Sequence, residues 1–147
     1  MKKVTMISLI TLFIVTSCKE NTQGTSNDTS TTKQNYSNLT PLEVVNKRMN
    51  YFNEHNYDEF IKLYNTDVKV YTYPDNLMGT GSDRLASIFK SDFESKSVAV
   101  KIVNQMDNGP YVINHEIVSN NGKETKYISI YKVEKGLISA VSFVRDF

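Results

Sequence analysis

Two tight turns divide the last third of the sequence and restrict how its strands can pair. Asn121-Gly122 and Lys135-Gly136 each lie between runs in which apolar and polar residues alternate. Such alternation is typical of a β-strand with one buried face, and a short Gly-containing turn between two such runs predicts a hairpin. We therefore expect an antiparallel meander with strands over residues 98–106, 111–119, 125–134 and 137–146.

The same turns predict the register of the meander, and residues opposite each other share a face. Asn114 is expected opposite Ser129, Glu116 opposite Tyr127, and Ser129 opposite Ser142. One face, expected to be concave and to line a pocket, then holds Val112, Asn114, Glu116, Val118, Tyr127, Ser129, Tyr131, Ala140, Ser142 and Val144. The other, expected to be convex, holds Ile113, His115, Ile117, Ile128, Ile130, Val141 and Phe143, bordered by Lys126, Lys132 and Arg145.

The expected convex face is apolar and rimmed by cations. A patch of this kind is not expected to stay exposed to water on a monomer. The pattern therefore predicts a homodimer formed through this face of the sheet.

Helices are expected in the preceding segment. Thr40, Pro41 and Glu43 together predict a helix start, because Thr and Glu at this spacing form a capping box and Pro suits the first turn. A second helix is expected from Asn56, and a third from Ser82 as its cap. A strand is expected over residues 67–73, and a loop over Gly79–Gly81.

The order of helices and strands predicts an α+β domain over residues 41–147. In this range the stretches YFNEHNYDEFIKLYNTDVKVY, GTGSDRLASIFKSDF and YKVEKGLISAVSFVRD resemble the NTF2-like (SnoaL-like) superfamily. The resemblance implies a cone in which three N-terminal helices pack in a curved, mainly antiparallel sheet that leaves a pocket. It also places Ser129 at an inward-facing position, and implies pairing through the outer sheet face in many members.

One branch of this superfamily, the ketosteroid isomerases, has acids that this chain lacks. The resemblance places Tyr73 or a neighbour where that branch has a catalytic Asp, and Ser129 where it has a second acid. Arg48 stands at the position of its helix Tyr. The Asp-Arg-Asp pattern of the epoxide hydrolases is not evident either, so no complete catalytic set carries over.

Glu116 and Tyr127 are the weak candidates for catalysis, with Asn114, Ser129 and Ser142 beside them. A carboxylate in a partly apolar cavity can serve as a base, and hydroxyls can hold a developing oxyanion. The alternative is that Glu116 is a solvated strand residue near the rim.

Tyr71 and Tyr73 alternate along the expected strand and are further candidates for ligand binding. A tyrosine in a pocket can stack on a flat ligand and form one hydrogen bond. The alternative is that both are ordinary half-buried strand aromatics.

Other kinds of site are not expected. Two His without Cys or a spaced carboxylate pair nearby predict no metal site, and no cofactor motif is present. Arg145 and Asp146 are interpreted as a surface ion pair. Residues 41–147 carry 13 Lys/Arg and 14 Asp/Glu, so charge gives no reason to expect a nucleic-acid partner.

The first 17 residues have the pattern of a signal peptide: Lys2 and Lys3, then the apolar run MISLITLFIV, then small residues before Cys18. The sequence VTSC resembles the lipobox of bacterial lipoproteins, which implies cleavage before Cys18 and acylation (palmitate) of its thiol. Residues 18–40 are then expected to be the lipidated Cys and a flexible polar linker. The predicted location is the cell envelope, on the periplasmic or surface side of a membrane.

Two functions remain open at this point. The first is a membrane-anchored module that binds a small ligand or a partner without catalysis. The second is a small isomerase or hydrolase that uses Glu116 and Tyr127. The sequence favours the first, and leaves open whether the protein is an enzyme.

Overall fold

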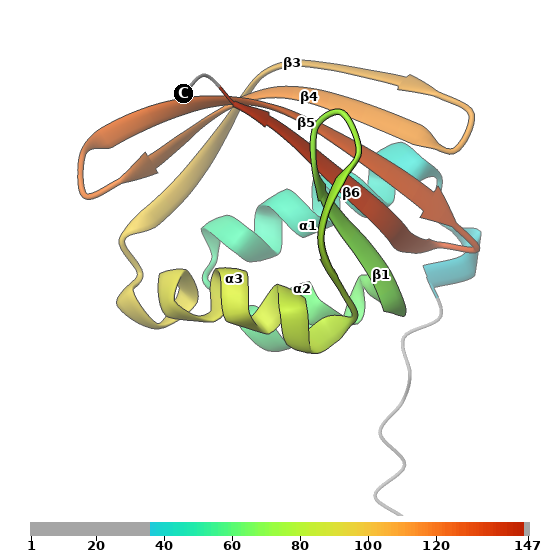
Figure 1. Cartoon of the computed structure of the whole chain (residues 1–147), viewed down its shortest axis with the longest axis horizontal. Coiled ribbons are helices and arrows are strands. Elements are labelled where there is room, and N and C mark those ends of the chain that lie inside the picture. The colour runs from blue at the N-terminus through green and yellow to red at the C-terminus, as the bar shows by residue number, and fades with distance from the viewer. Residues whose placement is uncertain (1–35, 146–147) are drawn as a thin grey trace, which may run out of the picture. The chain divides into compact units, whose positions relative to one another are not determined.

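Three α-helices lie against the concave side of a six-stranded sheet in the computed structural model, which describes residues 36–145 (Figure 1). The predicted signal peptide, Cys18 and most of the predicted linker lie outside the described residues, as does Asp146. Within residues 36–145, no helix has both the length and the apolar character needed to cross a membrane.

The helices are α1 (Pro41–Asn53), α2 (Tyr57–Lys62) and α3 (Ser82–Ser95), preceded by the short 3-10 helix η1 (Tyr36–Asn38). The capping box predicted at Thr40 and Glu43 is confirmed, and Asn56, from which the second helix is expected, is the N-cap of α2. At α3 the cap is Gly81, with no side-chain bond, and Ser82 is already helical, so the predicted Ser82 cap is wrong. Because α3 follows two strands, a block of three N-terminal helices is not confirmed.

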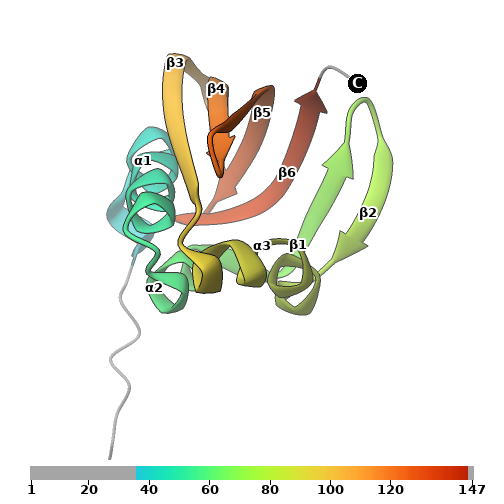
Figure 2. The same cartoon turned by 90° about the vertical axis from the view of Figure 1, so that its left-hand side faces the viewer.

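The strands are β1 (Tyr64–Thr72), β2 (Asn76–Thr80), β3 (Val98–Asn108), β4 (Tyr111–Asn120), β5 (Lys123–Glu134) and β6 (Leu137–Arg145). They form one sheet in the order β2-β1-β6-β5-β4-β3. Only the β1–β6 pair is parallel, so the expected mainly antiparallel sheet is confirmed. The sheet is strongly bent, and its concave side covers the helices (Figure 2).

The strand β2 was missed, since residues 79–81 were expected to form a loop. Four of its five residues pair with β1, so that Gly79 lies opposite Val70, and Met78 lies at an irregularity in the register. The side chains of β2 are mostly exposed, and a short edge strand of this kind lacks the buried alternation by which strands are recognised.

The turns predicted between the last three strands are confirmed. Asn121 and Gly122 both have positive φ, as do Lys135 and Gly136, which is the conformation required by a two-residue hairpin turn of type I′. The β4–β5 register is as predicted: Asn114 lies opposite Ser129, and Glu116 opposite Tyr127.

The predicted register between β5 and β6 is wrong by one residue. Ser129 lies opposite Phe143 instead of Ser142, because Lys132 pairs with Ala140 while the next residue, Val133, pairs with Ile138. Ser139 is therefore an extra residue in β6, a β-bulge, and one extra residue moves every later side chain to the other face. The concave face receives Val141, Phe143 and Arg145, whereas the convex face receives Ala140, Ser142 and Val144.

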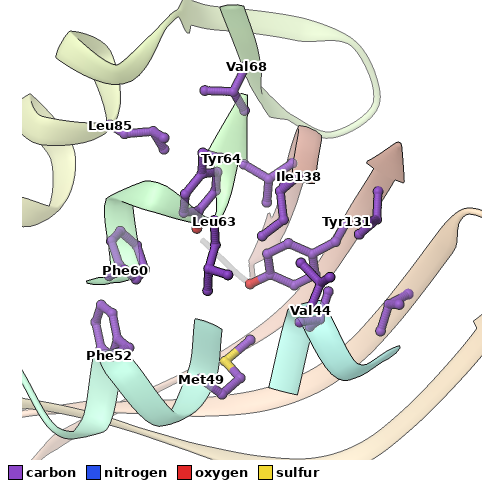
Figure 3. Packing of buried hydrophobic residues seen from close by; sticks show 14 of the residues in the cluster. Val44, Met49, Phe52, Phe60, Leu63, Tyr64, Val68, Leu85, Tyr131 and Ile138 are labelled. Atoms are coloured by element: carbon purple, nitrogen blue, oxygen red, sulfur yellow. The ribbon is translucent and has the colours of Figure 1, made fainter. Parts of the chain in front are cut away.

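The hydrophobic core lies between the helices and the concave face (Figure 3). Val44 and Met49 of α1 lie beside Tyr131 of β5, and Phe52 of α1 lies against Phe60 of α2. A cluster of aromatic rings extends this core between the helices: Phe52, Tyr57, Phe60, Tyr64, Phe89 and Phe93.

The core includes a residue that lies before the predicted boundary at residue 41. Tyr36 is buried in the core, and its carbonyl oxygen accepts a hydrogen bond of 3.0 Å from the amide of Leu39. A single aromatic ring in an otherwise polar segment was a weak signal of burial. Residues 33–147 form one compact unit with its own core, which is the property of a segment that folds independently.

Candidate functional site

A cavity of about 480 Å³ opens between the concave face of the sheet, α1 and α3. Its volume is within the usual range for sites that bind small molecules. The apolar part of its wall consists of Phe52, Met78, Ile88, Phe89, Val98, Val100, Val118 and Phe143. The polar part consists of Arg48, Thr72, Asn76, Asp92, Glu116, Tyr127 and Arg145.

Arg48 is the buried cation of this cavity, with 2% of its surface exposed. Its Nε donates a hydrogen bond of 2.9 Å to the hydroxyl oxygen of Tyr64, and Nη1 donates one of 3.2 Å to the sulfur of Met49. No hydrogen bond from Nη2 to any residue within 36–145 is present. The guanidinium carbon also lies 5.0–5.5 Å from four ring centroids, those of Phe52, Phe60, Phe89 and Tyr131.

Sequence spacing explains why Arg48 is buried. It lies four residues after Val44 and four before Phe52, and residues four apart share one face of a helix. The packing of these two residues therefore draws Arg48 into the core as well.

The charge on Arg48 is maintained by its surroundings. Burial alone lowers its pKa, but the oxygens of Tyr131 and Tyr64 and the carboxylate of Glu116 outweigh this, and the net pKa is raised. Burial also raises the pKa of both tyrosines, so each is a neutral phenol at neutral pH. Glu116 is thus the acidic side chain among the groups that raise the pKa of Arg48.

Glu116 is buried, with 2% of its surface exposed, and is held by hydrogen bonds from two neighbours. The hydroxyl of Ser129 donates to Oε1 over 2.5 Å, and Nδ2 of Asn114 donates to Oε2 over 3.4 Å. Gln105 continues this network, since its Nε2 donates to the side-chain oxygens of Asn114 and Asn46. The network fixes the position of the carboxylate from behind and leaves it on the cavity wall.

Arg48 and Glu116 both line the cavity but do not form an ion pair. No side-chain nitrogen of Arg48 lies within 4.0 Å of an oxygen of Glu116. The site therefore presents a positive and a negative group to the same space, each held by other partners.

The predicted pocket residues divide into three groups. Glu116 and Tyr127 line the cavity, as expected. Asn114 and Ser129 lie on the expected face but are buried behind Glu116, so they support the wall without forming it. Tyr71, Tyr73 and Ser142 are absent from the cavity wall, and their expected placement there is wrong.

The wrong prediction for these three residues has two physical causes. The bulge at Ser139 turns Ser142 to the convex face, where it pairs with Tyr71 of β1. On β1 the concave positions are Val68, Val70 and Thr72, so the alternate residues Tyr71 and Tyr73 face away, and Tyr73 is exposed.

Sequence reasoning missed several residues of the wall. The helical spacing of Arg48 indicates burial, but the resemblance relates it only to the helix Tyr position of the ketosteroid isomerases. Arg145 was assigned to the border of the convex face, and the bulge moves it to the cavity. Asp92 of α3 is a further wall residue outside the sequence predictions, and burial raises the pKa of its carboxyl group.

Neither His lies in the cavity wall. A ring nitrogen of His55 lies 3.0 Å from the carbonyl oxygen of Val98, and His115 is half-buried on the convex face. Among residues 36–145, no three side chains of His, Cys, Asp and Glu are grouped so that they could hold a metal ion.

Solved structures share this fold at low sequence identity. An NTF2-like protein of unknown function from Cytophaga hutchinsonii has a TM-score of 0.61 and 22% identity, over 74% of this chain and 91% of that one. An uncharacterized cystatin-fold protein from Novosphingobium aromaticivorans gives 0.67 and 18%, over 73% and 99%. An LEH-like epoxide hydrolase from Mycobacterium tuberculosis gives 0.59 and 15%, over 72% and 82%.

These similarities define the class of fold: an NTF2-like α+β domain with a curved sheet around a pocket.

No protein-family model matches the sequence. A protein of African swine fever virus, named as a candidate RNA ligase, is 27% identical over 99 residues, or 67% of this chain. The match spans only 22% of the viral protein. A shared fold does not imply a shared function, so function has to be argued from the site.

Proposed function

We propose that this protein is a lipoprotein of the cell envelope whose NTF2-like domain binds a small ligand without catalysing a reaction. The observation that carries the proposal is the cavity itself, which combines a largely apolar wall with the buried guanidinium of Arg48 and carboxylate of Glu116. Ligand sites in proteins are typically apolar with a few fixed polar groups that orient the ligand.

Ligand binding is tested by purifying residues 33–147 from cell extract and identifying by mass spectrometry what remains bound. The matched control is Ile88→Trp, which fills the cavity from α3 and is checked for folding by circular dichroism. We expect a small molecule to accompany the wild-type domain and not the variant. Equal recovery from both would contradict a ligand in this cavity.

Anchoring is proposed through Cys18, on the basis of the signal-like sequence that precedes it. Two or more acyl chains hold a protein on a bilayer far more firmly than one. Cys18→Ala should move the protein out of the membrane fraction, with the domain still folded. An unchanged membrane fraction would rule out the lipid anchor.

We also propose a homodimer through the convex face. After the correction of β6, this face still carries Ile113, Ile117, Ile128, Ile130 and Val144, each only half-buried. Light scattering of residues 33–147 at micromolar concentration should give the mass of a dimer, and Ile128→Lys should give a monomer. A wild-type monomer would end this proposal.

The second candidate function is that of a small isomerase or hydrolase. It is favoured by one observation: Glu116 and Tyr127 lie opposite each other on neighbouring strands, and both line the cavity. If any activity is detected on a panel of esters, epoxides and enolisable ketones, Glu116→Gln should abolish it. Activity that survives this change would remove Glu116 as its base.

A further inference from the structure

The polar groups of the cavity also specify what kind of ligand fits it, an inference that rests on the proposed ligand binding. We propose that the ligand is neutral, with an apolar body and one terminal group that is both donor and acceptor, as in a primary carboxamide. The carbonyl oxygen of this group accepts from Arg48, and its N–H donates to Glu116.

The first argument is the unused hydrogen-bonding capacity of the two residues. Arg48 has five N–H donors, and its Nη2 has no partner among residues 36–145, although the side chain is almost fully buried. A carboxylate has about four acceptor positions. Ser129 and Asn114 occupy two of those on Glu116. Two buried side chains on the wall of one cavity therefore have a donor and an acceptor position that no other residue within 36–145 uses.

The second argument is charge. Four ionisable side chains other than Tyr127 line the cavity, two basic (Arg48 and Arg145) and two acidic (Asp92 and Glu116), so their formal charges cancel. A carboxylate ligand reaching Arg48 would place a second negative charge beside Glu116. A cationic ligand reaching Glu116 would meet Arg48. A neutral group with donor and acceptor side by side satisfies both residues without either conflict.

The third argument is the distance between the two residues. Since Arg48 and Glu116 are not within 4.0 Å of each other, their unused positions are not consumed by a direct ion pair. Beyond them, the rings of Phe52, Phe89 and Phe143 and the side chain of Ile88 form a wall suited to an apolar body.

The test uses three probes with the same body: naphthalene-2-carboxamide, 2-naphthoate and naphthalene. Binding to residues 33–147 is measured by titration calorimetry near neutral pH, where naphthoate is an anion. Hydrogen bonds to charged groups are stronger than those between neutral groups, so the carboxamide should bind at least about tenfold more tightly than either other probe.

The Glu116→Gln variant makes the test sharper. It removes the negative charge and retains the shape, so Arg48 becomes available to an anion. We expect naphthoate to gain at least about tenfold in affinity and the carboxamide to lose affinity. Glu124→Gln, an exposed change on β5, should alter neither affinity.

Any other ranking of the three probes on the wild-type domain would overturn the inference. If naphthoate or naphthalene binds the wild-type domain as tightly as the carboxamide, the cavity remains a binding site but its specificity is not the one proposed. If no probe binds, the inference fails, while the co-purification experiment still decides the proposed function. Should Glu116→Gln not fold, the ranking of the three probes on the wild-type domain decides the matter alone.

Discussion

The Nε of Arg48 on α1 donates a hydrogen bond of 2.9 Å to the hydroxyl oxygen of Tyr64 on β1, and both side chains are buried. This bond links the helix that carries the buried cation to the strand beside β6. With Nε bonded to Tyr64 and Nη1 to Met49, Nη2 has no hydrogen-bond partner within residues 36–145.

The first prediction concerns this bond. Tyr64→Phe should lower the free energy of unfolding by about 1.5–3 kcal/mol, because a charged donor in the core loses its acceptor. Urea denaturation of residues 33–147 measures the change. Tyr111→Phe, at an exposed position, is the control and should have little effect. Equal stabilities of the wild type and Tyr64→Phe would show that the bond contributes nothing to folding.

The turn between β5 and β6 gives the second prediction. Gly136 has φ +77°, and a Cβ atom there would collide with the backbone of Tyr36, whose carbonyl oxygen would be 2.2 Å away. Gly122 has nearly the same φ, +79°, with open space around it. Gly122→Ala should cost about 1–2 kcal/mol from its left-handed conformation alone.

Gly136→Ala should cost about 1–3 kcal/mol more than Gly122→Ala, because η1 has to move away from the turn. The comparison is made by urea denaturation of the two variants. The same cost for both would mean that η1 does not press on this turn in solution.

The capping box of α1 gives a prediction about pH. The backbone amide and then the hydroxyl of Thr40, both hydrogen-bonded to Glu43, lower the pKa of its carboxyl group. A lowered pKa in the folded state means that ionised Glu43 stabilises the domain above the unfolded-state pKa, and that this is lost as pH falls through the folded-state pKa.

Glu43→Gln retains the hydrogen bonds but loses the charge. The variant should therefore be less stable than the wild type at neutral pH and equally stable on the acidic side of the folded-state pKa. Thermal unfolding across this range measures the difference, with the exposed Glu54→Gln as control. If the difference in stability between the two proteins persists unchanged in acid, it is caused by the changed shape of the side chain and not by the loss of its charge.

Sequence patterns were sufficient for the parts of the fold that depend on local chemistry. Asn121-Gly122 fixed the β4–β5 register because the turn determines which residues face each other, and this register brings Glu116 opposite Tyr127. Thr40 and Glu43 likewise marked the start of α1 through contacts three residues apart.

The errors arose where tertiary structure overrides local pattern. The bulge at Ser139 has no signal in the sequence, because the strand alternates equally well in either register. It exchanged Ser142 for Phe143 in the cavity wall. The burial of Arg48 was readable from its spacing to Val44 and Phe52, but its use of Tyr64 as a partner depends on the position of β1 relative to α1.

The last prediction concerns Asp92, which lines the cavity from α3. Burial raises the pKa of its carboxyl group. A raised pKa in the folded state means that this group favours folding below its unfolded-state pKa, and that this stability is lost as pH rises through the folded-state pKa. Ionised Asp92 therefore destabilises the domain at neutral pH.

Asp92→Asn removes this ionisation, so the variant should be more stable than the wild type at neutral pH and equal to it below the ordinary aspartate pKa of about 3.9. Chemical denaturation at a series of pH values measures the difference, and Glu94→Gln, exposed on the same helix, should show none. A variant that is less stable at neutral pH would indicate that ionised Asp92 has a favourable partner in the cavity. In that case burial would not be the dominant influence on the ionised form of Asp92. The balance of charges proposed around the ligand would then have to be revised.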